Sequence, residues 1–459
     1  MPFNTDPLSI EEIQNTIRKV RGGSTPSPLD QVPYLVFQKC PSLHRALGDL
    51  FNMCWRLGKV PIGWKQGVIR LIPKAAAKED PATPSNFRPI ALTSCVGKLF
   101  TSVMKNRWLT FMTSNGYLDT SIQKAFLPGV PGCLEQYHKL SAAITDAHKH
   151  HRSLTVCWLD IANAYGSVHH GLIEFSLSHY HAPSNFLKMV SDLYTNLSAI
   201  VTSKSWSTKA LPLQVGVYQG DPLSVAIFNT VMVTLTDSLR ADRALGYSFS
   251  NSMRSMNVLQ YADDTCLVAN ELASCQEMLQ KVERWLNWTG MRAKVPKCFS
   301  LAIGASSGKK YDPGLKLSGQ DIPFIANNTI KFLGGPISVP QTVSHQKQHL
   351  KEKLEWCLQR VEEVPVSRKQ TLLLYKAGIC PKLSWDLSIM DLPLSWVKSS
   401  LESRATRFLK KWSGLAKSAD PSRLYLPKCN GDLQLPPLTL LYKKLKTSQA
   451  SLMLTSADR

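Results

Sequence analysis

Three acidic side chains, at two places in the chain, have the types and settings that divalent-metal chemistry requires. Asp160 ends the apolar run Leu154–Leu159, which predicts a strand buried on both faces. Asp263 and Asp264 lie between two short apolar runs in NVLQYADDTCLVAN (257–270), and we predict that they form the turn of a β-hairpin. Because adjacent like charges repel, we expect a cation beside this pair.

Templated phosphodiester synthesis is a reaction that would use such a set of residues. It needs two Mg²⁺ ions, one to lower the pKa of a primer 3′-hydroxyl and one to hold a triphosphate. We predict that Asp160 and Asp263 bridge two Mg²⁺ ions, for which Mn²⁺ could substitute, that Ile161 lends its carbonyl, and that Asp264 is second in line. Each pattern also has a plainer interpretation, since Asp160 could cap the next turn and YADD could be an ordinary solvated hairpin.

The surrounding sequence predicts the elements that must position these acids. From 153 to about 337, apolar strands alternate with amphipathic helices, which indicates a domain of mixed helix and sheet. Helical spacing of apolar residues predicts further helices at 10–20, 42–57 and 94–112 upstream and at 343–363, 367–380 and 395–413 downstream. Several cations in the last of these segments suggest either a solvated face or a surface that follows a phosphate backbone.

Composition restricts the partners and the compartment. With 54 Lys and Arg against 33 Asp and Glu, the formal charge of +21 favours a polyanionic partner. An apolar fraction of 44% supports a sizeable core. The 11 cysteines lack zinc-knuckle spacing, and neither a secretory signal nor a membrane span is evident, so we expect an intracellular protein, nuclear or cytoplasmic, of undetermined oligomeric state.

An ordered series of motifs resembles the reverse transcriptases of non-long-terminal-repeat (LINE-like) retrotransposons. The resemblance covers about 60–410. Its upstream motifs are IRLIPK (69–74), NFRPIAL (86–92) and QKAF (123–126). Its central and downstream motifs are Asp160 with Ala164 and Tyr165, GVYQGDPLS (216–224), YADD (261–264), GMRAKVPKC (290–298) and KFLG (331–334).

This resemblance implies an α+β, right-hand polymerase fold with fingers, a palm whose antiparallel sheet carries the catalytic Asp residues, and a helical thumb. We therefore divide the chain into an N-terminal helical extension (1–60), fingers and palm (61–337), and a thumb with a basic C-terminal region (338–459). The implied activity is that of an RNA-directed DNA polymerase, which copies an RNA template with deoxynucleoside triphosphates from the 3′ end of a DNA primer or target.

The resemblance also assigns residues to the nucleotide. Tyr165 would lie beneath the sugar and exclude a 2′-hydroxyl, or it is simply a core aromatic. Lys74 and Arg88 would grip the triphosphate, or they serve only surface solubility. Gln219 and Gly220 would touch nucleotide and template, although QGDPLS also has the features of a well-started core helix.

Two further roles concern the leaving group and the primer. Lys297 matches the lysine of the family that protonates departing pyrophosphate, and a structural lysine is the alternative. Phe332, Leu333 and Gly334 match the primer grip, where glycine would let the backbone approach the primer, and a plain turn is the alternative.

The chain departs from the family in its template contacts and in its nuclease. Leu127 and Tyr218 stand where arginine is common, and Val225 replaces a common proline, so we expect altered substrate affinity. No endonuclease fits before residue 60, and the downstream cysteines, Cys357, Cys380 and Cys429, are too far apart in sequence for zinc knuckles. We therefore expect a polymerase fragment, a decayed copy or a domesticated polymerase, with its template, target site and nuclease undetermined.

Two other functions compete with reverse transcription. A catalytically weak or inert nucleic-acid-binding module would keep the basic cleft, but the intact Asp160, Asp263 and Asp264 argue against it. An RNA-dependent RNA polymerase is disfavoured by Tyr165, and by Tyr261 with Ala262 where such enzymes usually have glycine.

Overall fold

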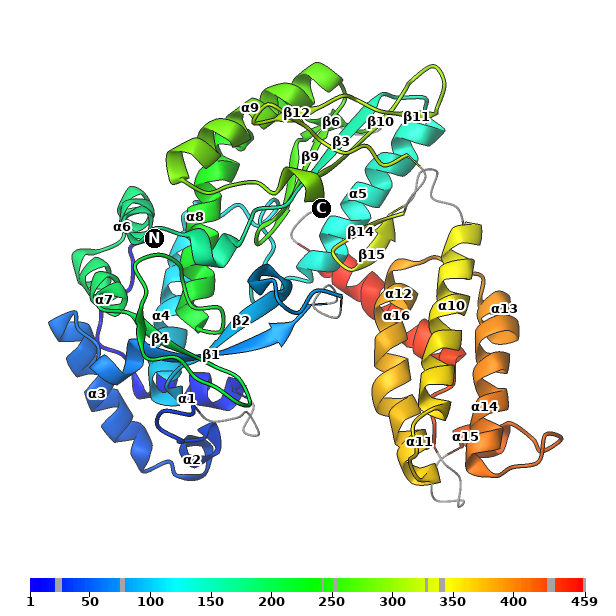
Figure 1. Cartoon of the computed structure of the whole chain (residues 1–459), viewed down its shortest axis with the longest axis horizontal. Coiled ribbons are helices and arrows are strands. Elements are labelled where there is room, and N and C mark those ends of the chain that lie inside the picture. Colours follow the sequence, from blue (N-terminus) through cyan, green and yellow to red (C-terminus); the bar gives the residue numbers. More distant parts are fainter. Residues whose placement is uncertain are drawn as a thin grey trace.

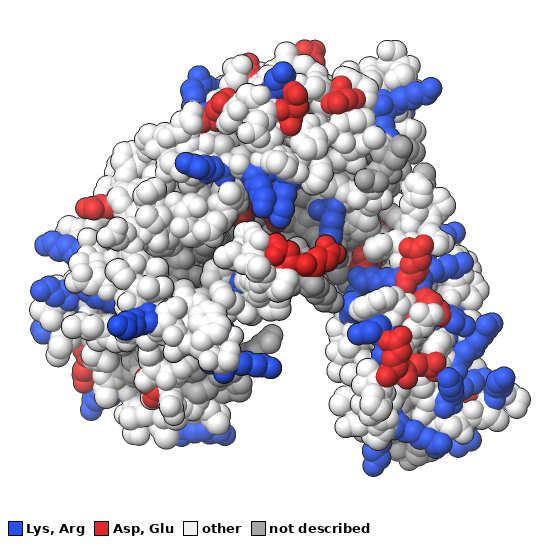
Figure 2. All heavy atoms as spheres, viewed as in Figure 1, with Lys and Arg blue, Asp and Glu red and all other residues white. Residues whose placement is uncertain are grey.

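The computed structural model describes residues 1–20, 27–74, 79–241, 243–250, 255–326, 329–337, 343–426 and 434–456. Figure 1 shows a large body that contains both main sheets, and beside it a bundle of helices from the last third of the chain. The surface is hollowed between the body and the bundle (Figure 2). This is the predicted right-hand arrangement, with fingers and palm in the body and the bundle as thumb.

The fingers begin with helices that pack on one another. The helix α1 (Ile10–Lys19) contacts α2 (Tyr34–Lys39), α3 (Leu43–Leu57) and the longer α4 (Cys95–Ser114). Ser9 and Glu12 form a capping box at the start of α1, which satisfies backbone N–H groups of its first turn. The predicted helices at 10–20, 42–57 and 94–112 are therefore confirmed, with boundaries that agree to within two residues.

A buried arginine fastens this N-terminal segment to α4. The Arg107 side chain is 4% exposed and pairs with Glu12, with an Nη2 to Oε2 distance of 2.8 Å. Its guanidinium also donates to the carbonyls of Asp6 (2.6 Å) and Pro7 (3.2 Å). A buried charge that loses its partner is left uncompensated, so this network fixes the segment only while it is complete.

Glu12→Ala should therefore destabilise the protein by about 2 kcal/mol, less than for a fully buried pair because Glu12 keeps some solvent contact. Denaturant unfolding measures this loss. Glu11→Ala is the matched control, because Glu11 lies in the same helical turn and is exposed, and its effect should stay within about 0.5 kcal/mol. Equal effects of the two substitutions would contradict the anchoring role of Arg107.

The fingers sheet has the strand order β2-β1-β4-β5. β1 (Gln66–Pro73) pairs antiparallel with β2 (Phe87–Leu92) and parallel with β4 (Ser198–Thr202), which pairs with β5 (Leu211–Pro212). Residues 75–78, in the predicted polar loop between β1 and β2, lie outside the described residues.

The palm sheet carries the first acidic residue at the end of a central strand. Its order is β11-β10-β3-β9-β8, and all its pairings are antiparallel. The strands are β3 (Leu154–Leu159), β8 (Val258–Tyr261), β9 (Asp264–Ala269), β10 (Phe299–Ile303) and β11 (Lys310–Tyr311). Every residue of β3 is buried, as the apolar run predicted. The register pairs Leu159 with Thr265, so Asp160 follows β3 beside the start of β9.

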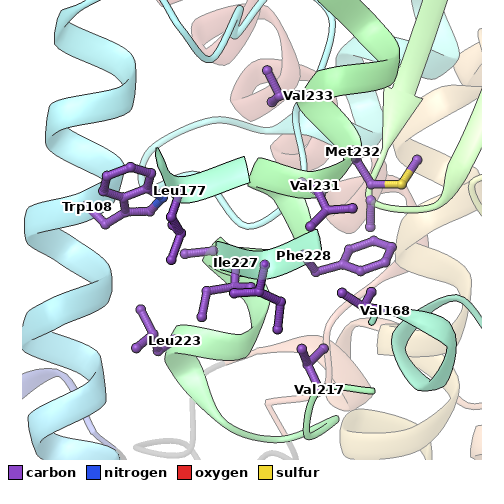
Figure 3. Close-up of a cluster of buried hydrophobic side chains, with 14 of the residues drawn as sticks. Trp108, Val168, Leu177, Val217, Leu223, Ile227, Phe228, Val231, Met232 and Val233 are labelled. Atoms are coloured by element: carbon purple, nitrogen blue, oxygen red, sulfur yellow. The ribbon is translucent and has the colours of Figure 1, made fainter. Parts of the chain in front are cut away.

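Three helices pack against the palm sheet: α5 (Gly132–Lys149), α8 (Pro222–Arg240) and α9 (Leu272–Thr289). Two more helices lie further out, since α6 (His170–His179) packs on α8, and α7 (Ser184–Tyr194) packs on α6 and α3. α8 lies at the centre, with Asp221 as N-cap and Pro222 in the first turn, as predicted. Figure 3 shows its apolar side chains meeting those of α4, α6 and two loops, among them Trp108, Val168, Leu177, Val217, Ile227 and Phe228.

By length and composition alone, α8 could cross a membrane. However, 72% of its most apolar window is buried inside the fold, as in the core helix of a globular domain. Trp108 of α4 also donates its indole N–H to Thr230 of α8 at 2.8 Å, a polar contact within this core. α8 therefore serves as the packing centre that joins fingers to palm.

The thumb is a helical bundle with two segments of π-helix. Its elements are α10 (Val343–Glu362), α11 (Arg368–Leu374), the π-helix η7 (Tyr375–Ile379), α12 (Cys380–Ile389), α13 (Leu394–Trp396), the π-helix η8 (Val397–Glu402), α14 (Ser403–Ser413), α15 (Ser422–Tyr425) and α16 (Leu438–Thr455). The three predicted thumb helices are present, but the second continues past residue 380 into α12. Pro381 did not end this helical run, in which it follows the π-helix η7 by one residue.

Candidate active site

The acidic hairpin has a tighter turn than the sequence predicted. Tyr261 pairs with Asp264, so the two-residue turn is Ala262–Asp263, and Asp264 is the first residue of β9. Our prediction that Asp263 and Asp264 together form the turn was therefore wrong by one residue. The reason is the backbone of Ala262, whose φ of 56° supplies the left-handed conformation that a two-residue hairpin turn needs.

A buried glutamine holds this turn in place. In the sequence it is distinguished only as the first residue of the QKAF motif. Gln123 accepts a hydrogen bond from the Ala262 N–H (2.9 Å) and donates to the Ala262 carbonyl (3.2 Å) and to Gln260 Oε1 (2.9 Å). Gln123 is 1% exposed, so these bonds form away from water. The QKAF motif is thus a structural support for the hairpin, and its match to the family was the signal that could have identified it.

The three carboxylates lie close enough to repel one another. Burial raises the pKa of Asp263, and the negative charge of Asp160 raises it further. Burial, followed by the charges of Asp263 and Asp160, raises the pKa of Asp264 to about 6, although that side chain keeps an exposed face. Burial also raises the pKa of Asp160, against the opposing charges of Lys297, Lys294 and Lys74. None of the three acids has an ion-pair partner within 4.0 Å in the described part of the chain.

The predicted metal ligands are not all side chains, because one of them is a backbone carbonyl. Over the described ranges, no group of three or more His, Cys, Asp or Glu side chains could hold a metal ion by itself. The predicted ligands, however, are two carboxylates and a backbone carbonyl. Bonds from Ala162 N–H to Arg292 O and from Lys294 N–H to Asp160 O, both 2.8 Å, flank Ile161, and no described residue donates to the Ile161 carbonyl. Carboxylates without an ion-pair partner and a free backbone carbonyl are the oxygen ligands that hard cations prefer.

Asp264→Asn should stabilise the metal-free protein above pH 6. Because the pKa of Asp264 is about 6 in the fold and about 3.9 in an unfolded chain, its ionised form disfavours folding, and this penalty disappears as pH falls from 6 towards 4. Solvent screening limits the effect, so we expect the melting temperature in EDTA to rise by about 2 °C at pH 7.5 and hardly at all at pH 4.5.

The exposed Asp321, on a separate hairpin, supplies the control substitution, Asp321→Asn, which should change neither value. A destabilised Asp264→Asn protein at pH 7.5 would show that Asp264 is favourably paired rather than repelled.

Lys74 and Arg88 of the fingers, which we predict to bind the triphosphate, lie on the side of the site opposite the acids of the palm. Lys74 is held at the end of β1, where its N–H donates to the Asn86 carbonyl (2.8 Å) and its ammonium to the Ser85 carbonyl (2.9 Å). Burial lowers the pKa of Lys74, as do the positive charges of Lys297 and Arg88, whereas Asp160 opposes them. Lys74, Arg88 and Lys297 therefore share one electrostatic environment with Asp160.

Tyr165 lies beside the same acids. It belongs to the 3₁₀ turn η4 (Ala164–Ser167) that follows Asp160, and its ring stacks on Phe228 with centroids 4.4 Å apart and planes 14° apart. Burial raises the pKa of Tyr165, and the charge of Asp263 contributes next. The ring is only half-buried, so the core role and the nucleotide role are compatible.

Gly220 is required where the loop before α8 crosses β2. The Gln219 carbonyl accepts from the Ala91 N–H at 2.8 Å, which joins this loop to the fingers. A Cβ on Gly220 would lie 2.6 Å from the Ala91 carbonyl oxygen, and the φ of Gly220 is 132°. Only glycine fits this approach, so the loop that carries Gln219 is positioned by backbone contacts.

The predicted primer grip is a hairpin at the border of palm and thumb (Figure 1). β14 (Ile330–Phe332) and β15 (Gly335–Ile337) are joined by Leu333 and Gly334, both with positive φ (47° and 86°). Tyr137 of α5 donates its hydroxyl to the Pro336 carbonyl at 2.7 Å, which ties the hairpin to the palm. Phe332 is buried, and no described interaction links Phe332, Leu333 or Gly334 to the three acids.

Two of the departures from the family are packing residues. Leu127 is 8% exposed and Tyr218 is 7% exposed. The Tyr218 hydroxyl donates to the Ser198 carbonyl at the start of β4 and lies 3.3 Å from the Lys65 carbonyl, so it packs against the fingers sheet. These side chains therefore do not face the cleft directly, and our expectation that they alter substrate contacts has no support from their positions.

The described cysteines are all free thiols, and Cys357 and Cys380 are buried in the thumb, whereas Cys429 lies outside the described residues.

Comparison with known proteins gives a consistent result. The family model described as "Reverse transcriptase (RNA-dependent DNA polymerase)" matches residues 72–337, more than half of the chain. The Pol polyprotein of the type-2 retrotransposable element R2DM of Drosophila melanogaster is 24% identical over 412 residues, which cover 88% of this chain and 37% of that protein. The Pol polyprotein of the type-1 element R2 of Nasonia vitripennis is 25% identical over 476 residues, 98% of this chain and 42% of the relative.

The RNA-directed DNA polymerase from the mobile element jockey of Drosophila melanogaster is 22% identical over 455 residues, which cover 95% of this chain and 47% of the relative. The chain thus spans less than half the length of each of these three relatives. On the match over 72–337, and in agreement with the non-long-terminal-repeat motifs in its sequence, the chain belongs to the reverse transcriptase (RNA-dependent DNA polymerase) family.

Proposed function

We propose that this chain is an RNA-directed DNA polymerase that extends a DNA primer on an RNA template with deoxynucleoside triphosphates. The observation that carries the proposal is the convergence of Asp160 with the Asp263–Asp264 hairpin, opposite Lys74 of the fingers. Reverse transcriptases as a family use divalent metal ions, and we propose Mg²⁺ as the physiological ion, with Mn²⁺ as a substitute. The charge of +21 suits two nucleic-acid strands as partners, in the nucleus or the cytoplasm.

Each of the predicted site residues has a separate role in nucleotide addition. Asp160, Asp263 and the Ile161 carbonyl would hold the ions, with Asp264 beside them; when bound, the ions activate the primer 3′-hydroxyl and neutralise charge on the triphosphate. Lys74 and Arg88 would grip the triphosphate from the fingers side. The primer 3′-hydroxyl loses its proton to solvent as its oxygen forms a bond to the α-phosphorus. The bond from this phosphorus to the bridging oxygen breaks, and Lys297 would give a proton to the departing pyrophosphate.

Primer extension tests the proposal. A labelled DNA primer on a generic RNA template, with deoxynucleotides and Mg²⁺, should be extended to the template end, and EDTA should stop the reaction. A folded wild-type protein that binds this substrate in a salt-dependent manner without extending it would instead select the inert binding module. Extension by ribonucleotides with equal efficiency would select an RNA polymerase.

A further inference from the structure

A second lysine, Lys294, lies in the turn that is bonded to the catalytic strand. The loop before β10 runs antiparallel to the residues after β3, with a bridge between Ile161 and Ala293. The Lys294 N–H donates to the Asp160 carbonyl at 2.8 Å. This hydrogen bond holds the backbone of Lys294 beside Asp160. Lys294 also begins the 3₁₀ turn η6 (Val295–Lys297), because its carbonyl accepts from the Lys297 N–H at 2.7 Å. The two lysines therefore share one rigid turn.

The side chain of Lys294 is exposed and faces the same charges as Lys297. Its positive charge acts on the Asp160 carboxylate and also on the Lys74 ammonium across the cleft. It has no ion-pair partner among the described residues.

Four cations thus surround a site with three acids. Lys74 and Arg88 come from the fingers, and Lys294 and Lys297 come from the palm. Burial lowers the pKa of Lys74, and the positive charges of Lys297, Arg88 and Lys294 lower it further, so these cations repel one another when no ligand is bound. A nucleoside triphosphate carries several negative charges and would relieve this repulsion when it binds between them.

We propose that Lys294 is a positioning residue that binds the triphosphate of the incoming nucleotide from the palm side, together with Lys297. This inference rests on the proposed polymerase function and adds to it one residue that binds the triphosphate. Because the backbone of Lys294 is hydrogen-bonded to Asp160, a triphosphate bound by Lys294 would be held at a defined position relative to Asp160, which would also hold the ions. Lys294 contributes binding before and during the reaction, whereas Lys297 acts on the leaving group.

The test is single-nucleotide incorporation by Lys294→Ala, Lys294→Arg and a control, Lys309→Ala, at an exposed lysine beyond β10. Lys294→Ala should raise the KM for the deoxynucleotide about tenfold and change kcat less than about threefold, which is the pattern of lost uniform binding. Lys294→Arg should restore most of the affinity because it keeps the charge, and Lys309→Ala should match the wild type.

A second readout does not depend on chemistry. With a dideoxy-terminated primer, the deoxynucleotide concentration that protects the enzyme–primer–template complex from competitor duplex should rise about tenfold in Lys294→Ala. An unchanged KM and unchanged protection in Lys294→Ala, with an active wild type, would overturn the inference and leave the proposed function intact. A lower kcat with unchanged KM would also overturn it, since that result indicates proton donation. A wild type that extends no primer would defeat the proposed function, and the inference with it.

Discussion

Asp263→Asn should lower primer extension by at least about 10³-fold while the protein stays folded. Asp263 occupies the turn between β8 and β9, close enough to Asp160 for that charge to raise its pKa in addition to burial, and our account assigns this pair to the two ions. Asparagine keeps the shape and one acceptor oxygen but removes the charge. The loss should therefore appear in kcat, measured under single-turnover conditions with saturating deoxynucleotide.

The comparison variants make this result specific. Asp264→Asn should lose less activity than Asp263→Asn, because Asp264 begins β9 and is second in line for the ions. Asp321→Asn changes an exposed acid on a distant hairpin and should be fully active. If Asp263→Asn retained more than a tenth of wild-type activity, the assignment of Asp263 as a metal ligand would be wrong.

Tyr165→Ala should relax discrimination against ribonucleotides by about 10- to 100-fold. The ring of Tyr165 lies just beyond Asp160 and is held by stacking on Phe228 at 4.4 Å, so it forms a rigid wall rather than a mobile side chain. The 2′-hydroxyl of a ribonucleotide would clash with this ring, whereas the methyl side chain of alanine would leave room for the hydroxyl. The ratio of kcat/KM for a deoxynucleotide to that for the matching ribonucleotide measures the effect.

Tyr165→Phe separates the ring from the hydroxyl. It keeps the ring and its stacking on Phe228, so discrimination should remain within about threefold of the wild-type value. Equal loss of discrimination in both variants would assign the effect to the Tyr165 hydroxyl and would contradict steric exclusion. Unchanged discrimination in Tyr165→Ala would leave the tyrosine with a purely structural role in the core.

The chemistry of the site could be predicted from sequence because buried strands and charges leave clear patterns. Six consecutive buried residues in β3 made Asp160 conspicuous, and the apolar runs around Asp263 located the hairpin. The exact turn could not be predicted, because it depends on a positive φ at Ala262, which is an unusual conformation for alanine. Gln123 supplies the hydrogen bonds that support this turn, from 139 residues away in sequence.

The thumb was less predictable, for a different reason. Two of its segments are π-helix, and π-helix shifts the spacing at which apolar residues share a face. α16 escaped notice because only Leu438 and Tyr442 of its residues are buried, so its sequence lacks a strong apolar stripe. Local patterns therefore identified the palm, whereas the thumb depends on tertiary contacts such as the bond from Tyr375 to the Pro436 carbonyl.

The most direct test is a crystal structure of the wild-type protein with an RNA template, a dideoxy-terminated DNA primer, a deoxynucleoside triphosphate and Mn²⁺. We predict two separate anomalous peaks, both contacted by the carboxylates of Asp160 and Asp263, with the Ile161 carbonyl on one of them. Peaks bound elsewhere, or a nucleotide whose triphosphate lies away from residue 160, would contradict the account.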